Sequence, residues 1–185
     1  MSAEERLIRY CRVDTQSDPK NDGETPSTEK QFDLAKILEQ ELKELGLENV
    51  ELDEHCYVYG WLPANTDVKA KTVGFIAHMD TAPDFSGKDV KPRIIENFDG
   101  NDIVLNPEVV LKMEDFPQMR NLKGKRLMVT DGNTLLGADD KAGVTCIMEA
   151  MAYLHEHPEV KHGRIAVAFT PDEEIGNGPK YFDVK

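Results

Sequence analysis

The sequence predicts an α/β fold in which helices flank a mainly parallel or mixed sheet, giving three layers. Three short, apolar and partly β-branched segments, residues 72–77, 126–129 and 164–169, are typical of buried strands. A long segment with helical periodicity separates the last two. This strand, helix, strand order near the C-terminus is typical of a parallel βαβ unit.

Two helices are expected before the first strand. Residues 4–13 predict a short helix, and the polar loop 14–24 that follows is expected to be exposed and flexible. Thr25 or Ser27 can cap the second helix, and Gly46 can end it. The stripe expected to face the core consists of Ala35, Leu38, Leu42 and Leu45.

The middle of the chain predicts short strands and a long irregular segment. Residues 50–62 predict one or two strands with a break near Asp53, and Trp61 is expected to cover the core. The next strand is expected to end at His78. Prolines exclude a long helix from residues 83–125, a kind of segment that often borders a binding site. The short strands expected there lie near 93–95 and 103–105.

A turn and a strong helix precede the last strand. Residues 131–133 have the composition of a turn, and residues 141–155 predict a helix. Gly163 separates this helix from the strand that follows. The apolar face of the helix consists of Val144, Ile147, Met148, Met151 and Leu154.

Composition limits the class of protein. A chain of 185 residues with 39% apolar content fits one globular domain. The formal charge of -13 opposes binding to nucleic acid or to anionic membranes, although it suits divalent cations. No apolar run approaches the ~20 residues of a membrane helix, and the first ten residues are not signal-like, so we expect a cytoplasmic protein. The three cysteines are widely spaced and are expected to be reduced packing residues: Cys11, Cys56 and Cys146.

Polar residues follow the apolar segments at three places. His78 and Asp80 stand two residues apart at a strand end, so both side chains can point the same way. Asp80 can then accept a hydrogen bond from one imidazole nitrogen while the other binds a metal. A simple hydrogen-bonded histidine is an equally good interpretation of this pair alone.

Asp139 and Asp140 lie between Gly137 and the start of a helix. One of them can be the helix N-cap, which leaves the other carboxylate without a structural explanation. Small neighbours such as Gly137 let the backbone approach an ion closely.

Glu173 and Glu174 are adjacent and therefore face different directions. They can form a solvated loop, or they can divide two tasks, with Glu174 binding a metal and Glu173 acting as a general base. Zinc suits a mixture of imidazole and carboxylates better than magnesium or calcium, although manganese or cobalt can use the same ligands. A carboxylate shared by two ions ~3.5 to 4 Å apart is typical of hydrolases.

The chain resembles the N-terminal part of the tripeptide aminopeptidases, within a family of co-catalytic zinc exopeptidases that also includes aminoacylases and succinyl-diaminopimelate desuccinylase. The matching segments extend over nearly the whole chain and include residues 13–17, 26–29, 62–65, 74–81, 131–143 and 167–174.

The resemblance implies a role for each polar residue. His78 would bind one zinc, Asp139 would bridge both zincs, and Glu174 would bind the second. Glu173 would be the general acid/base, and Asp80 would support His78. The resemblance also implies a cis peptide bond before Asp140, short peptides as substrates, and two zinc ions per complete subunit.

Members of this family extend well beyond the length of this chain. They contribute another acidic ligand, a lid or dimerisation domain, and a final histidine ligand. Two four-coordinate zincs sharing one carboxylate and one water need about four further ligands, whereas only His78 and Glu174 are available beyond Asp139. We therefore expect residues 1–185 to be the N-terminal part of a catalytic domain, inactive alone and a weak metal binder; a homodimer of the full-length protein is left open.

Two other interpretations are compatible with these motifs. A related metal-dependent dipeptidase or deacylase would use the same metal ligands and differ in its substrate. A non-catalytic metal-binding module belongs to a different class, and it would be favoured if 185 residues were the natural length.

Overall fold

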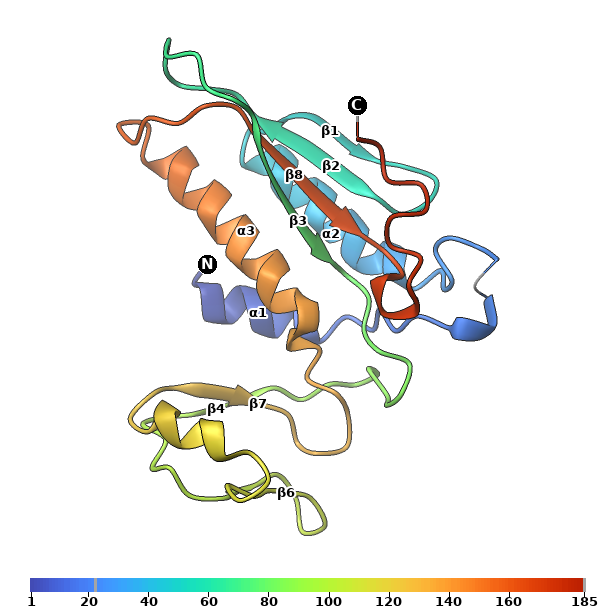
Figure 1. Cartoon of the computed structure of the whole chain (residues 1–185), viewed down its shortest axis with the longest axis vertical. Coiled ribbons are helices and arrows are strands. Elements are labelled where there is room, and N and C mark those ends of the chain that lie inside the picture. The colour runs from blue at the N-terminus through green and yellow to red at the C-terminus, as the bar shows by residue number, and fades with distance from the viewer. Residues whose placement is uncertain (22, 185) are drawn as a thin grey trace.

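The computed structural model describes residues 1–21 and 23–184. Its main sheet has the strand order β1–β2–β8–β3, as Figure 1 shows. β8 pairs in parallel with β3 and antiparallel with β2, which in turn pairs antiparallel with β1. These strands are β1 (Glu48–Leu52), β2 (Val58–Leu62), β3 (Val73–His78) and β8 (Ile165–Thr170). The predicted α/β fold with a mixed sheet and flanking helices is therefore confirmed.

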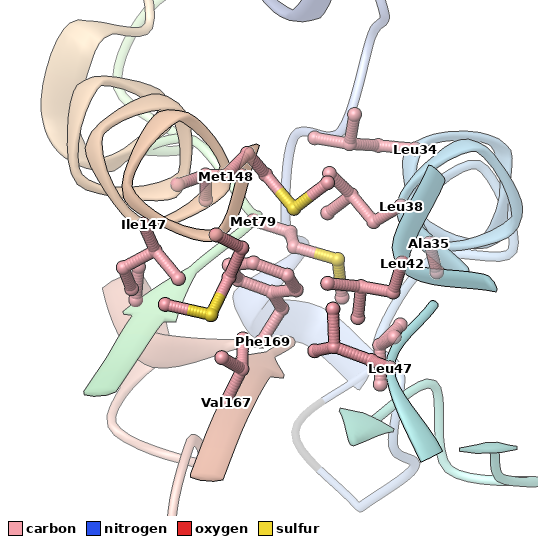
Figure 2. Packing of buried hydrophobic residues seen from close by; sticks show 14 of the residues in the cluster. Leu34, Ala35, Leu38, Leu42, Leu47, Met79, Ile147, Met148, Val167 and Phe169 are labelled. Atoms are coloured by element: carbon pink, nitrogen blue, oxygen red, sulfur yellow. The ribbon is translucent and has the colours of Figure 1, made fainter. Parts of the chain in front are cut away.

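Three α-helices share one core with one face of this sheet: α1 (Ala3–Cys11), α2 (Gln31–Glu44) and α3 (Ala138–Glu156). Figure 2 shows Leu38 of α2 and Met148 of α3 converging above Phe169 of β8. Their burial supplies most of the apolar contact that stabilises the sheet. A second cluster, formed by Tyr57, Tyr59 and Ala168 with Trp61 and Phe182 packed against them, lies on the opposite face of the sheet. Trp61 therefore covers that smaller cluster rather than the main core.

A smaller unit separates β3 from α3 along the chain. β4 (Arg93–Ile95) pairs with β7 (Leu127–Val129), and β5 (Ile103–Val104) pairs with β6 (Val110–Leu111). A 3-10 helix, η2 (Pro117–Leu122), completes the unit, which lies to one side of the main sheet in Figure 1. Its core consists of Phe98, Ile103, Met113 and Val129.

The placement of residues 126–129 in the main sheet was wrong, because Leu127 and Val129 pack in the separate core of this unit. The parallel connection in the main sheet instead runs from β3 through α3 to β8. The strands predicted near 93–95 and 103–105 are confirmed.

The predicted cap of the second helix was also wrong. α2 begins at Gln31, and its N-cap residue, Lys30, makes no side-chain cap. Ser27 cannot serve because its hydroxyl accepts from the backbone N–H of Asp18 and donates to Asp172. Gly46 does end the helix, and its φ of 74° is a conformation that glycine adopts without strain.

The loop between α1 and α2 is only partly exposed, contrary to expectation. Thr15 and Ser17 are buried, and Gln16 forms a parallel β-bridge with Thr81. The Thr15 hydroxyl also donates to the carbonyl of Met79 at 2.7 Å. The loop supplies hydrogen-bond partners to the chain that follows β3, and it contains η1 (Pro19–Asn21). Asp22 lies outside the described residues.

β3 is the last strand of the main sheet in the described residues, and its first residues are not covered on both faces as expected. Phe75 and Ile76 are exposed, whereas Ala77 and His78 are buried. Among the cysteines, Cys11 and Cys56 are buried, but Cys146 is exposed and is not a packing residue. No helix in the described part of the chain is long and apolar enough to cross a membrane.

Candidate active site

His78 is the last residue of β3, and its imidazole lies between carboxylates. Its Nδ1 donates to the backbone carbonyl of Asp80 at 3.1 Å and lies 3.3 Å from the Asp80 side-chain Oδ1. Its Nε2 lies 3.1 Å from Oδ1 of Asp139 and 3.7 Å from Oε2 of Glu173. Asp80 thus fixes the imidazole at Nδ1, and Nε2 points to acidic groups from two other segments.

Asp139 and Asp140 divide their tasks. Asp139 and Asp140 have non-helical backbone angles at the start of α3, and the peptide bond between them is cis, as the resemblance implied. The Asp140 carboxylate accepts from the backbone N–H of Gly143 at 3.0 Å, which is the capping interaction of the helical turns that follow. The Asp139 side chain is 88% exposed and reaches His78 instead. Gly137 brings this segment close to Thr81, since a Cβ at Gly137 would lie 3.1 Å from the Thr81 methyl group.

The acidic pair lies in η3 (Glu173–Ile175), the 3-10 turn after β8. The backbone N–H of Glu173 donates to Asp80 Oδ1 at 2.9 Å, and that of Glu174 donates to Asp80 Oδ2 at 3.1 Å. Asp80 is fully buried, so these hydrogen bonds satisfy a carboxylate that has no access to water. The end of β3 and the turn after β8 are therefore fixed to each other.

The electrostatics of the cluster favour a cation. Burial alone would lower the pKa of His78, but the hydrogen bonds and charges of Asp80, Asp139 and Glu173 outweigh it and raise this pKa to about 9. Burial also raises the pKa of Glu174, and the nearby carboxylates of Asp80, Asp139 and Glu173 act in the same direction. A positive charge among these groups would relieve their mutual repulsion.

The predicted ligands fit a metal in kind but are incomplete as a set. His78 offers an imidazole nitrogen that faces the carboxylate of Asp139, and imidazole with carboxylates is a zinc-type donor set. The Glu174 backbone is held beside this pair by its hydrogen bond to Asp80, and the charge of its carboxylate interacts with that of His78. In residues 1–21 and 23–184, no three His, Cys, Asp or Glu side chains are already arranged to hold a metal ion.

Two residues beside the site, Lys141 and Asp172, lie in the motifs of the sequence but were given no role. Lys141 is 1% exposed, and its Nζ donates to the carbonyl of Val13 at 2.7 Å, so it ties the start of α3 to the loop after α1. Burial lowers the pKa of Lys141 to about 8. Asp172 is fully buried immediately before the acidic pair. Their burial could not be predicted from the sequence, because a lysine in the first turn of a helix and an aspartate in a loop are normally exposed.

The chain is closely similar to curated proteins over nearly all of its length. It is 59% identical over 182 residues to Peptidase T from a Geobacillus species and 54% identical over 183 residues to Peptidase T from Clostridium acetobutylicum. These alignments cover 97% and 98% of this chain but only 44% and 45% of the relatives. The chain therefore spans less than half the length of the curated relatives it matches, and the resemblance to the tripeptide aminopeptidases is confirmed.

A family model and solved structures agree with this similarity. The model described as Peptidase family M20/M25/M40 matches residues 128–183. Aminopeptidase PepT from Bacillus cereus superposes with a TM-score of 0.67 at 27% identity, covering 98% of this chain and 39% of that one. A tripeptidase from Staphylococcus aureus gives a TM-score of 0.66 at 22% identity with the same two coverages, which supports the fold alone.

Proposed function

We propose that this chain carries part of the active site of a zinc-dependent aminopeptidase that releases the N-terminal residue of tripeptides. The observation that carries the proposal is the meeting of His78, Asp139 and Glu173 beside the buried Asp80. These residues lie in a chain that is similar to Peptidase T over nearly all of its length. Residues 1–185 would then form the N-terminal part of the catalytic domain, in a cytoplasmic protein.

The residues have separate tasks in this proposal. His78 would bind one zinc through Nε2, Asp139 would bridge two zincs, and Glu174 would bind the second. When bound, the two ions would supply Lewis-acid activation of the water and of the peptide carbonyl. Asp80 keeps the His78 ring in place through its contacts at Nδ1, which is the usual arrangement behind a histidine ligand.

Glu173 would be the general base that transfers the proton of the attacking water. Its side chain is exposed, while its backbone is fixed by Asp80, so its carboxylate can reach a substrate without losing its anchor. Its Oε2 would accept a proton from the attacking water and deliver it to the departing amine of the cleaved peptide. Adjacent carboxylates would hold the free amino group of the substrate by charge.

The proposal can be tested with a chimeric protein in which residues 1–185 replace the matching part of the 59% identical Geobacillus relative. The chimera should release the N-terminal residue from tripeptides in the presence of zinc, and it should cleave dipeptides and acylated amino acids much more slowly. The chain by itself should be inactive and should hold zinc weakly, because His78, Asp139 and Glu174 cannot complete two zinc shells.

Three results would contradict the proposal. A chimera that folds and binds zinc but cleaves no tripeptide would exclude the activity. Equal rates on dipeptides or acylated amino acids would favour a dipeptidase or a deacylase. Manganese or cobalt that supports turnover better than zinc at matched occupancy would overturn only the identity of the metal.

A further inference from the structure

Asp172 is a fully buried carboxylate directly before the acidic pair. Its side chain accepts three short hydrogen bonds, from the backbone N–H of Ser27 at 2.7 Å, from the Ser27 hydroxyl at 2.6 Å and from Nε2 of Gln31 at 2.7 Å. Hydrogen bonds to a charged group are strong, and here they offset the cost of removing the carboxylate from water. This side chain joins the turn after β8 to the segment that leads into α2; Figure 1 shows the two regions side by side.

Gln31 contacts both the side chain and the backbone of Asp172. Its Nε2 donates to Asp172 Oδ1, and its Oε1 accepts from the Asp172 backbone N–H at 3.2 Å. Gln31 is itself fully buried at the first position of α2, so its amide has little freedom to turn. The two residues therefore form a paired contact that fixes both the position and the direction of the chain at Asp172.

The turn is held on its other side by Asp80. The N–H groups of Glu173 and Glu174 point to the Asp80 carboxylate, while the Asp172 carbonyl accepts from the N–H of Asn177 at 2.9 Å. Asp172 has a left-handed backbone with φ of 54°, which reverses the chain between these two anchors. The backbone of the acidic pair is thus fixed from two directions, whereas the Glu173 side chain is free to reach His78.

We propose that Asp172 and Gln31 act together as a positioning pair that holds the turn so that the carboxylate of Glu173 faces His78, with Glu174 beside it. The proposal rests on the proposed function, because the direction of these carboxylates matters only if they bind metal and move protons. A small rotation of the turn would carry Glu173 Oε2 away from its place 3.7 Å from His78 Nε2. Positioning of this precision is what catalytic carboxylates require.

The pair can be tested by exchanging the hydrogen-bond donor of Gln31 and the acceptor of Asp172. In Asp172→Asn, an amide NH₂ faces the NH₂ of Gln31, and in Gln31→Glu two carboxylates face each other. In the double variant Asp172→Asn/Gln31→Glu, the new amide donates to the new carboxylate, which also accepts the N–H of residue 172. Asparagine tolerates the left-handed backbone as well as aspartate does, so the single variant changes hydrogen bonding rather than backbone strain.

The first measurement is amide hydrogen exchange of Glu173 and Glu174 in the metal-free chain, followed by NMR. Each single variant should speed exchange at these two amides about tenfold relative to the slowest amides of α3, and the double variant should restore it. Gln40→Glu makes the same chemical change at an exposed position of α2 and should leave these amides unchanged. A variant that only destabilised the fold would instead speed exchange at Glu173, at Glu174 and at the slowest amides of α3 by the same factor.

The second measurement is titration of the same variants with zinc alone, followed through the amide signals of His78, Glu173 and Glu174. Each single variant should weaken zinc binding about tenfold or more, and the double variant should recover most of it. If exchange at Glu173 and Glu174 is unchanged in the single variants, or is not restored in the double variant, the positioning pair is excluded. If exchange behaves as expected but the chimera neither binds zinc nor cleaves tripeptides, the positioning pair stands and the proposed function fails.

Discussion

Asp80 Oδ1 accepts a hydrogen bond from the backbone N–H of Glu173 at 2.9 Å. The same carboxylate accepts the N–H of Glu174 and lies 3.3 Å from His78 Nδ1. One buried side chain therefore connects the end of β3 with the acidic turn after β8, two segments that are 93 residues apart in the chain. The geometry at His78 and the geometry of the acidic pair depend on each other through Asp80.

Asp80→Ala should lower the free energy of unfolding of the metal-free chain by about 2 kcal/mol or more, because the backbone N–H groups of Glu173 and Glu174 lose a charged acceptor. Urea unfolding followed by circular dichroism measures this change. Asp139→Ala is the matched control, since it removes a carboxylate that also contacts His78 but is 88% exposed. It should change stability by about 0.5 kcal/mol or less. Equal losses in the two variants would contradict a connecting role for Asp80.

Substitutions of Asp139 and Asp140 should have different effects, one on metal binding and the other on stability. In the chimera, Asp139→Ala should lose most of its zinc, because the bridging carboxylate is removed, whereas Asp140→Ala should keep zinc. Asp140→Ala should instead destabilise the chain by about 1 kcal/mol through loss of the cap on Gly143. Zinc content measured by atomic emission and urea unfolding test both statements. Two retained zincs per chain in Asp139→Ala would overturn its bridging role.

The effect of a substitution at Gly143 should depend on its hydrogen bond to the Asp140 carboxylate. A Cβ at this position would lie 2.2 Å from Asp140 Oδ1, so the Asp140 side chain would have to leave its place. Gly143→Ala should therefore bring no stabilisation in the normal chain, although alanine is the better helix former by about 1 kcal/mol. In an Asp140→Ala background the same substitution should stabilise by about that amount. Thermal unfolding of the normal chain, the two single variants and the double variant measures this difference. Equal stabilisation by Gly143→Ala in both backgrounds would refute the steric conflict between a Cβ at position 143 and the Asp140 side chain.

Glu173→Gln should lower kcat of the chimera by about 10² or more while zinc content stays normal, because the amide cannot accept the proton of the attacking water. Glu174→Gln is the matched control at the neighbouring residue and should lower zinc content as well as activity. Steady-state kinetics on a tripeptide, together with metal analysis, distinguish the two. Near-normal turnover in Glu173→Gln would remove it from the role of general base.

The sequence was informative where a site residue directly follows an apolar strand. His78 ends β3 and Glu173 follows β8, and because these strands run in parallel their ends meet at one edge of the sheet. The partners of Asp172 could not be predicted in this way, because Ser27 and Gln31 lie more than 140 residues away and only the fold brings them together. The same limit explains the error at β7.

β7 shows that an apolar pattern does not determine which core a strand belongs to. Leu127 and Val129 are apolar because they pack in a core, but that core is the small one around Phe98 and Met113. Periodicity reports that a strand is buried and not which strand it pairs with. The contact of Asp139 with His78 is a further case, since the sequence showed that one of two aspartates was not needed as a cap but not which one.

The edge of the main sheet predicts association of the chain with itself. β3 ends the strand order, so one of its edges has no partner strand in the described residues, and Ile76 on it is 58% exposed. Exposed apolar edge strands pair readily with other strands. Sedimentation velocity should therefore show concentration-dependent oligomers, and Ile76→Lys should shift the chain towards monomer, because a charge on the strand opposes pairing. Tyr153→Lys replaces a similarly exposed apolar residue that lies on α3 rather than on β3, and it should leave association unchanged. A chain that stays monomeric at high concentration, or equal dissociation in both variants, would show that β3 is not the associating edge.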